Sequence, residues 1–261
     1  MRKELTGALI FLCLAFVASA QYTTINAHSH NDYEQKIPFY LAYNARFGSI
    51  EADIWAINGE LFVAHNKSAI AASKTLDILY IQPIVELFKK NGGKVSSDIS
   101  YTFQLMIDLK TEVEPTLSLL TEKLKKYPEV FDPAVNKNAV RITITGNRPE
   151  PTRFKDYPVF ISFDGNVSKR YDPEQLKRVA LYSENLVVFT KWRATEAIPE
   201  KEEVRLKQII DSVHGINKKI RFWNAPDTQD AWKILMGLGV DFINTDHIPE
   251  LSTFLKTIKT N

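Results

Sequence analysis

Residues 48–55 read GSIEADIW, a short apolar run that carries an acid at alternate positions. Residues i and i+2 of a β-strand point to the same face, so Glu51 and Asp53 would share one side of a strand. The flanking isoleucines and tryptophan are residues that favour strands. The stretch therefore predicts a strand with two carboxylates on one face, and the fold follows from how often such runs recur.

Further β-rich runs of this kind alternate with amphipathic, helix-like segments. The β-rich runs are residues 24–28, 48–55, 103–109, 140–145, 159–163, 186–192, 220–223 and 240–245. The predicted helices are residues 114–126, 174–182, 199–214 and 227–236. Asp172 followed by Pro173 is a typical helix start, and Gly215 a typical helix end. Strands that alternate with helices indicate parallel βα units, and eight such units predict an α/β fold that is a single (β/α)8 TIM barrel. The alternative is an open doubly wound sheet, although no glycine-rich phosphate loop follows the first run.

Composition limits the classes of protein and of partner. The chain has 261 residues, of which 44% are apolar and 25% charged, which suits one domain of barrel size. No linker or composition break occurs over residues 21–261, so we expect one domain there. The formal net charge is +2, with 33 basic and 31 acidic residues and no long block of one sign. Bulk charge therefore gives no support for a nucleic-acid partner or an anionic membrane.

The N-terminus is typical of an export signal. Basic residues at positions 2 and 3 precede an apolar run at 8–17 and the small residues ASA at 18–20. The run is shorter than the roughly 20 residues that a membrane span needs. We therefore expect a signal peptide at residues 1–20, cleaved near Ala20, and a periplasmic or extracellular protein without a stable membrane anchor. Cys13, the only cysteine, would be lost with it, which excludes disulfides and thiolate metal sites.

Polar pairs at i, i+2 spacing close several of the predicted strands. They are His28-x-His30, Glu51-x-Asp53, Asp108-x-Lys110, Ser162-x-Asp164 and Asn244-x-Asp246. Each pair lies at the carboxyl end of a strand, where the active sites of TIM barrels are found. The pattern predicts a functional site at that mouth of the barrel.

Three carboxylates, Glu51, Asp53 and Asp108, would share one corner of this mouth. Two like charges about 4 Å apart repel by about 1 kcal/mol in water and about 4 kcal/mol at an effective dielectric of 20. Such a cluster should take up protons or hold a cation, and all-oxygen ligation favours Mg²⁺ or Ca²⁺ over zinc. We predict one divalent cation; the alternative is that arginine or lysine pairs with the acids.

His65 can reach these acids only if the hairpin before it has a suitable register. A strict two-residue turn at Asn58-Gly59 would set His65 opposite Ala52, on the wrong face. A three-residue loop at 57–59 with a one-residue bulge would set it opposite Glu51 instead. We predict the bulged form.

Three other aromatic or imidazole side chains need a separate interpretation. Trp223, at the end of the run at 220–223, either forms the wall of a pocket or lies in the core. His214 is expected on the surface at a helix end, and His247 in a loop just past the last strand.

The motifs resemble those of the glycerophosphodiester phosphodiesterase and phosphatidylinositol phospholipase C-like superfamily, in family order over nearly all of residues 21–261. The matching segments are NAHSHND (26–32), SIEADIW (49–55), GELFVAH (59–65), LMIDLK (105–110) and GVDFINTDH (239–247). The branch with an H-x-H-N-D-Y start is most similar. The resemblance implies a (β/α)8 barrel, one divalent cation, and hydrolysis of a phosphodiester by two histidines, often through attack by a hydroxyl of the substrate itself.

The matching positions also imply roles for individual residues. We expect metal ligands at Glu51, Asp53 and Asp108, an acid–base pair of His28 and His65, and substrate contacts from His30, Asn31, Lys110 and Trp223. Three positions depart from the usual pattern: Ser29 stands in place of an arginine, Asn66 in place of an aspartate, and Asp108 where glutamate is common. These departures leave open which small-molecule or lipid-derived phosphodiester is the substrate.

Two other functions are compatible with the sequence. The H-x-H start also resembles that of amidohydrolases and histidine-type metallohydrolases, but those enzymes need further histidine or lysine ligands on the middle strands. The chain has only 5 histidines. The second is a catalytically inactive barrel that binds a phosphorylated ligand. A metal-free glycosidase fits poorly, because Lys110 would lie in the acid cluster. The sequence gives no indication of oligomeric state.

Overall fold

The structure is a computed structural model that describes residues 22–258. The expected signal peptide, residues 1–20, lies outside the described residues. Within residues 22–258, no helix is both long enough and apolar enough to cross a membrane.

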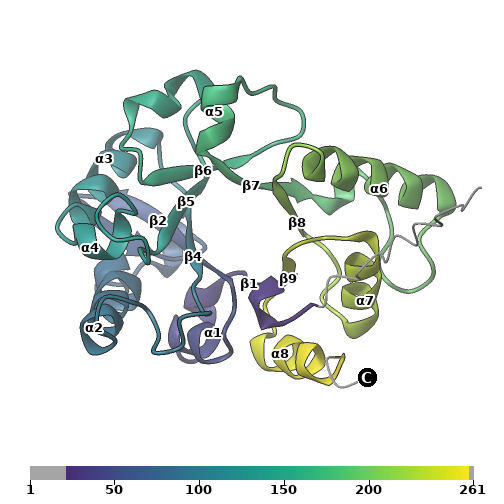
Figure 1. The fold of residues 1–261 in the computed structure, drawn as a ribbon, viewed down its shortest axis with the longest axis horizontal. Coiled ribbons are helices and arrows are strands. Elements are labelled where there is room, and N and C mark those ends of the chain that lie inside the picture. The colour runs from purple at the N-terminus through teal and green to yellow at the C-terminus, as the bar shows by residue number, and fades with distance from the viewer. Residues whose placement is uncertain (1–21, 259–261) are drawn as a thin grey trace, which may run out of the picture.

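Parallel β-strands form a nearly closed barrel, and the helices surround it (Figure 1). The strands, including the antiparallel β3, are β1 Ala27–Ser29, β2 Ser49–Ile57, β3 Glu60–Val63, β4 Gln104–Leu109, β5 Arg141–Gly146, β6 Ile161–Gly165, β7 Val179–Asn185, β8 Lys219–Trp223 and β9 Ile243–Thr245. Their order is β8-β7-β6-β5-β4-β2-β1-β9, and a single bridge between Arg221 and Phe242 joins the two ends. The predicted TIM barrel is confirmed, and the open doubly wound sheet is excluded.

The helices cover the outside of the barrel with their apolar faces inward. They are α1 Tyr40–Asn44, α2 Gln82–Lys90, α3 Val113–Leu124, α4 Pro128–Phe131, α5 Pro173–Arg178, α6 Glu200–His214, α7 Gln229–Leu238 and α8 Ile248–Thr257. In α3, the leucines at 117, 120 and 124 form one buried stripe at helical spacing. Burying each such side chain stabilises the fold by about 1.5–3 kcal/mol, so packing against the strands holds the helices in place.

The sixth strand does not lie where the sequence predicted it. The strand is β7, Val179–Asn185, whereas the predicted run at 186–192 begins with a 3₁₀ turn, Leu186–Val188. The predicted helix at 174–182 ends as α5 at Arg178, although its Asp172 cap is present. β7 pairs with β6 on one side and β8 on the other. These hydrogen bonds along both edges outweigh the local preference of its leucine and alanine for a helix.

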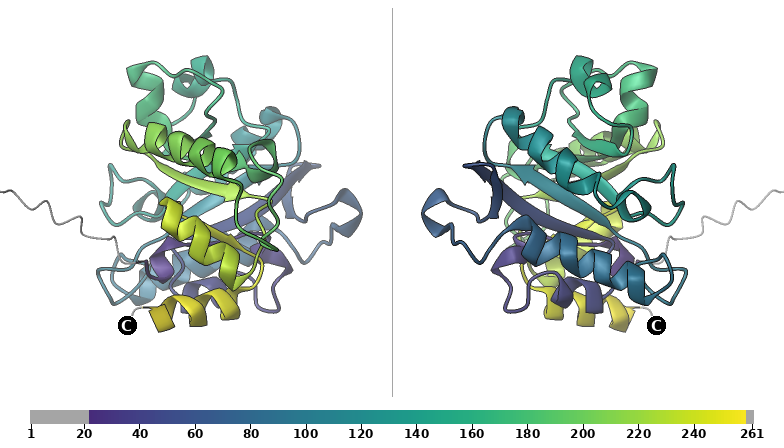
Figure 2. Two further views of the ribbon diagram at one scale, coloured as in Figure 1. Left: turned by 90° about the vertical axis from the view of Figure 1, so that its right-hand side faces the viewer. Right: turned by 90° about the vertical axis from the view of Figure 1, so that its left-hand side faces the viewer.

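The hairpin that joins β2 to β3 is tighter than predicted. Ile57 pairs with Glu60, and Asn58 and Gly59 both have positive φ, 50° and 79°. This is a two-residue turn, so the predicted bulged loop is wrong. His65 lies beyond the end of β3, where strand pairing no longer fixes the direction of its side chain. In the side views of Figure 2 this hairpin and the loop after it project from one end of the barrel, and the η1 turn (Thr24–Asn26) lies at the other.

Candidate functional site

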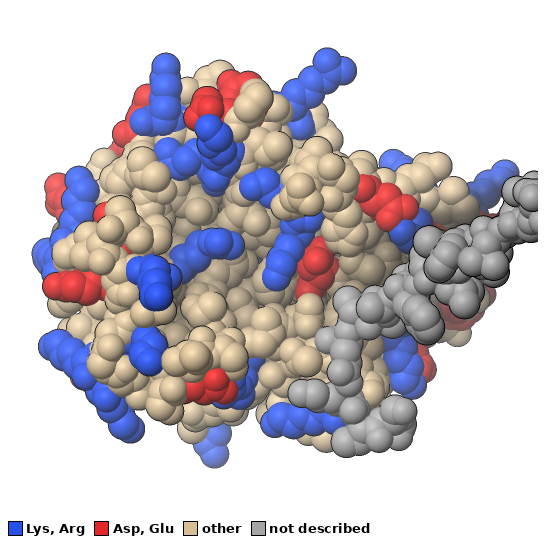
Figure 3. Space-filling view, viewed as in Figure 1, with Lys and Arg blue, Asp and Glu red and all other residues tan. Residues whose placement is uncertain are grey.

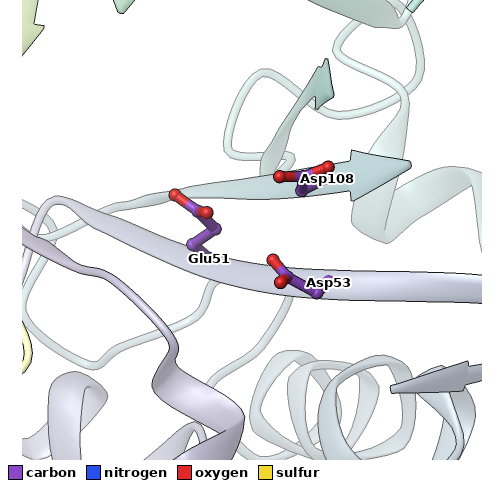
Figure 4. A group of neighbouring side chains, drawn as sticks. All are labelled: Glu51, Asp53 and Asp108. Atoms are coloured by element: carbon purple, nitrogen blue, oxygen red, sulfur yellow. The ribbon is translucent and has the colours of Figure 1, made fainter. Parts of the chain in front are cut away.

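Three carboxylates on the neighbouring strands β2 and β4 converge, as predicted, although Glu51 and Asp53 lie before the carboxyl end of β2. Glu51 and Asp53 lie on β2, and Asp108 lies on β4 directly opposite Asp53. One oxygen of each carboxylate lies within 4.8 Å of the others (Figure 4). Glu51 and Asp53 are buried, so their charges are little screened by water.

Two basic side chains form ion pairs with these three acids. The Lys110 Nζ lies 2.9 Å from Asp53 Oδ2 and 2.8 Å from Asp108 Oδ2. The Arg221 Nη1 lies 2.8 Å from Glu51 Oε2. The alternative to a cation, in which arginine or lysine pairs with the acids, therefore applies in part. Two positive charges against three negative ones leave a net negative charge when all the acids are ionised.

The surroundings of Asp53 disfavour its ionised form. Burial, and then the neighbouring Glu51 and Asp108, raise its pKa to about 6. Its Oδ1 is buried and has no hydrogen-bond partner in the described part of the chain. An unpaired buried polar atom costs about 1–3 kcal/mol. A hard cation with oxygen ligands would satisfy this atom and offset the surplus charge, so the residues fit Mg²⁺ or Ca²⁺.

Arg221 on β8 lies beneath Glu51 and was not among the predicted site residues. Its buried guanidinium donates to Glu51 at 2.8 Å, to Ser183 Oγ at 2.8 Å and to Asn244 Oδ1 at 2.9 Å, and it also contacts His28. Burial raises the pKa of Glu51, but Arg221 and the His28 hydrogen bond outweigh burial and hold that pKa well below its ordinary value. Arg221 therefore keeps Glu51 ionised.

His28 lies beneath the acid cluster, out of contact with solvent. Its Nδ1 is 2.7 Å from Ser49 Oγ, and its Nε2 is 2.7 Å from Glu51 Oε2. The Ser49 hydroxyl in turn accepts from Gln104 Nε2 at 3.0 Å. Burial, and then Arg221, lower the pKa of His28 to about 3, so the ring is neutral near pH 7. With both ring nitrogens bonded inside the protein, His28 orients Glu51 and has none free for a substrate.

His30 and His65 lie closer to the open mouth of the barrel than His28 does. In both rings the Nδ1 faces a carboxylate oxygen. The His30 Nδ1 is 2.9 Å from Asp246 Oδ1, and the His65 Nδ1 is 3.5 Å from Asp53 Oδ2. Both side chains are partly exposed, at 26% and 49%. Within residues 22–258, the Nε2 of each ring has no hydrogen-bond partner. Burial lowers the pKa of His30, but the hydrogen bond with Asp246 and the negative charges of Glu51 and Asp246 together outweigh burial, and the net effect is a raised pKa.

Tyr33, which was not among the predicted site residues, links this pair to the acids. Its hydroxyl lies 2.7 Å from Asp53 Oδ2, 2.8 Å from Asn31 Oδ1 and 3.4 Å from His65 Nδ1. The Asn31 Nδ2 lies 3.0 Å from His30 Nδ1. Asn31, predicted as a substrate contact, is thus part of a polar network that runs from one histidine to the other.

The structure also shows where Trp223, His214 and His247 lie. Trp223 is 39% exposed at the carboxyl end of β8, so it is not a core residue. His214 is exposed and lies 2.8 Å from Asp241, and His247 lies past β9, 3.9 Å from Asp227. The surface position of His214 and the position of His247 past the last strand are confirmed.

Comparison with known proteins identifies the family. Residues 17–150 match the family described as the AIM6-like phosphodiesterase domain, and residues 219–249 match the glycerophosphoryl diester phosphodiesterase family. The "Altered inheritance of mitochondria protein 6 homolog" of Arthroderma benhamiae is 35% identical over 267 residues, which cover 86% of this chain and 82% of the relative. The Kluyveromyces lactis protein named "Altered inheritance of mitochondria protein 6" is 26% identical, over 88% of this chain and 72% of that protein.

Solved structures share the fold. A glycerophosphodiester phosphodiesterase from Parabacteroides distasonis superimposes with a TM-score of 0.54 at 13% identity, over 90% of this chain and 98% of that one. An Oleispira antarctica phosphodiesterase, solved with its product sn-glycerol-3-phosphate, gives a TM-score of 0.50 at 12% identity, over 83% and 88% of the two chains. The chain therefore belongs to the AIM6-like phosphodiesterase family, within the glycerophosphodiester phosphodiesterase and phospholipase C-like superfamily.

Proposed function

We propose that the protein is an exported phosphodiesterase that hydrolyses a small or lipid-derived phosphodiester and depends on one Mg²⁺ or Ca²⁺ ion. The observation that carries this proposal is the convergence of Glu51, Asp53 and Asp108 within 4.8 Å, together with the unpaired, buried Oδ1 of Asp53. Export rests only on the pattern of residues 1–20.

The three carboxylates would hold the ion. When bound, the cation would supply Lewis-acid stabilisation of the negative charge on the phosphate oxygens. Lys110 adds a fixed positive charge beside the same acids, because it donates to both Asp53 and Asp108. Trp223 offers an exposed apolar surface at the same end of the barrel, suited to the alcohol part of a diester.

We assign the proton transfers to His30 and His65, in place of the predicted pair of His28 and His65. His65 accepts the proton of the attacking hydroxyl at Nε2 as a new bond to phosphorus forms. The ester bond on the opposite side breaks, and the protonated His30 gives its Nε2 proton to the leaving oxygen. The raised pKa of His30 favours the protonated ring that this role needs. General acid–base help of this kind contributes roughly 10²–10⁴-fold.

His28 becomes a positioning residue in this scheme. Its bond to Glu51 and its low pKa fit a neutral ring that fixes the direction of a ligand carboxylate. The amidohydrolase alternative finds no support. In residues 22–258, the group of side chains close enough to hold a metal ion contains three acids and no histidine.

A panel of phosphodiesters tests the proposal: glycerophosphodiesters, lysophospholipids, inositol lipids and sphingolipids, each with Mg²⁺, Ca²⁺ or a chelator. Phosphorus NMR would follow turnover and would reveal a cyclic phosphate. We expect turnover that stops with the chelator and in Asp108→Asn. Asp98→Asn is the matched control, because Asp98 is an exposed acid that pairs with Arg46. Undiminished turnover in chelator would contradict the cation. Tight binding of a diester without turnover would favour the inactive-barrel alternative.

A further inference from the structure

A hollow lies at the opposite mouth of the barrel from the acid cluster. It is a cavity of about 520 Å³, lined by residues at the amino-terminal ends of the strands, among them Gln104 of β4, Arg141 of β5 and Lys219 of β8. Ligand pockets usually measure about 300–1,000 Å³, so the cavity is large enough for a small molecule. The amino-terminal mouth of a TIM barrel usually serves stability, which makes an open cavity there notable.

The charge of the cavity lining is strongly unbalanced. Its basic residues are Lys94, Lys137, Arg141 and Lys219, and its acidic residue is Asp98. Asp98 is already paired with Arg46 at 2.7 Å. Among the residues that the structure describes, none of the four basic side chains has a carboxylate partner within ion-pair distance.

Figure 3, which views this face, shows lysine and arginine side chains around the hollow at its centre, with acidic surface beside them on one side. Burial lowers the pKa of the neighbouring Lys218, and the positive charge of Arg141 lowers it further. A bound anion would relieve this repulsion between like charges.

The same cavity has an apolar rim. Val159 and Ile99 line it and are 85% and 83% exposed. The Phe242 ring lies in the cavity wall, and the Lys219 Nζ lies 5.0 Å from its centre. These exposed side chains give the cavity apolar surface beside its cations. Unpaired cations beside an apolar rim suit a ligand that is anionic at one end and apolar at the other.

We propose that the amino-terminal mouth of the barrel binds a single-chain amphiphile with a phosphate or carboxylate head. The head contacts Arg141, Lys219 and Lys137, and the chain lies against Val159 and Ile99. This site is separate from the acid cluster and does not rest on the proposed phosphodiesterase activity.

Calorimetric titration of the purified protein with dodecyl phosphate, below its critical micelle concentration, tests this site. We expect saturable binding of one molecule per chain. The double variant Arg141→Gln/Lys219→Gln should weaken binding at least 10-fold. The matched control is Lys207→Gln/Lys233→Gln, which removes the same charge from exposed positions on α6 and α7. It should bind like the parent protein. Lys110→Gln should also bind normally, because Lys110 lies at the other mouth.

Four outcomes would overturn the proposal. Equal binding by the parent and the Arg141→Gln/Lys219→Gln variant would show that these cations do not hold the head. Equal affinity for the uncharged dodecyl maltoside would show that charge plays no part. Loss of binding in Lys110→Gln would place the ligand at the acid cluster. Association with phosphatidylglycerol vesicles, without saturable binding of the monomer, would indicate a membrane surface instead of a ligand site. Arg141 and Lys219 are exposed, so thermal unfolding should confirm that the double variant folds.

Discussion

Replacing Arg221 by methionine should destabilise the protein severely. The guanidinium is buried and donates to Glu51, Ser183 and Asn244. Methionine fills much of the same volume but leaves the buried carboxylate of Glu51 without its positive partner. Breaking a buried ion pair in this way costs about 3–5 kcal/mol. For a domain of this size, each kcal/mol lowers the melting temperature by about 2–4 °C, so we expect a fall of about 6–20 °C.

Urea unfolding followed by circular dichroism measures this loss, and its pH dependence tests the cause. In the parent protein the pKa of Glu51 is held below its ordinary value, so the stabilisation is present above the unfolded-state pKa and is lost as the pH falls through the folded-state pKa. In Arg221→Met, burial should raise the pKa of Glu51, and a proton taken up as the pH falls would neutralise the unpaired carboxylate. The difference in unfolding free energy should therefore be larger at pH 8 than at pH 5.

A matched variant separates this effect from the general loss of an arginine. Arg46 pairs with Asp98 at 2.7 Å, but both side chains are exposed, so Arg46→Met should change the unfolding free energy by less than about 1 kcal/mol. An equally small change in Arg221→Met, or the same change at both pH values, would refute the role given to Arg221.

Three further predictions concern the histidines, a buried acid and the exposed tryptophan. His30→Ala and His65→Ala should each lower turnover by about 10²-fold or more with little change in melting temperature. His28→Ala should also lower the melting temperature. If His28→Ala lowered turnover alone and His30→Ala also lowered the melting temperature, His28 would return to the acid–base pair. Burial raises the pKa of Glu184 from 4.5 to about 7. Between these pH values the folded state holds a proton that the unfolded state has lost, so the free energy of unfolding should fall as the pH rises from about 4.5 to 7. In urea titrations across that range Glu184→Gln should flatten the fall, and an unchanged slope would contradict this origin. Trp223→Ala should raise KM for diesters with a bulky alcohol and leave unfolding unchanged; an unchanged KM would remove Trp223 from the substrate site.

The parts of the fold that were predicted correctly rest on a strong local pattern. Apart from the sixth strand, each predicted β-rich run overlaps an observed strand, because a buried parallel strand needs a short, nearly continuous apolar segment. β7 escaped prediction because Ala180, Leu181 and Tyr182 extend the apparent periodicity of α5. Only pairing with two neighbouring strands, which a single sequence does not reveal, decides between helix and strand there.

The three acids and Lys110 were predicted as site residues, whereas Arg221, the basic partner of Glu51, was not. Glu51 and Asp53 stand out because carboxylates within an apolar run have no structural explanation. Arg221 lies 170 residues from Glu51 in the sequence, and only barrel closure brings the two together. One signal was available, because Arg221 and Trp223 have the same i, i+2 spacing as the other polar pairs.

The two histidines of the first strand show the limit of spacing arguments. His28 and His30 occupy equivalent alternate positions in the sequence, but His28 lies at the level of Ser49, whereas His30 is further toward the mouth. The sequence gives the face on which a side chain lies but not its depth in the barrel. The hairpin shows the same limit: His65 comes within 3.5 Å of Asp53 although the predicted bulge is absent, because β3 ends before it.

Binding of a divalent cation is the most direct test of the central claim. Titration calorimetry with Mg²⁺ and Ca²⁺ should give one ion per chain. At a concentration 100 times the dissociation constant, the ion should stabilise the fold by about 2.7 kcal/mol, which raises the melting temperature by about 5–11 °C. Asp53→Asn should abolish both effects, and Asp98→Asn should retain them. A parent protein that binds neither ion, or an Asp53→Asn variant that binds as well as the parent, would contradict the account.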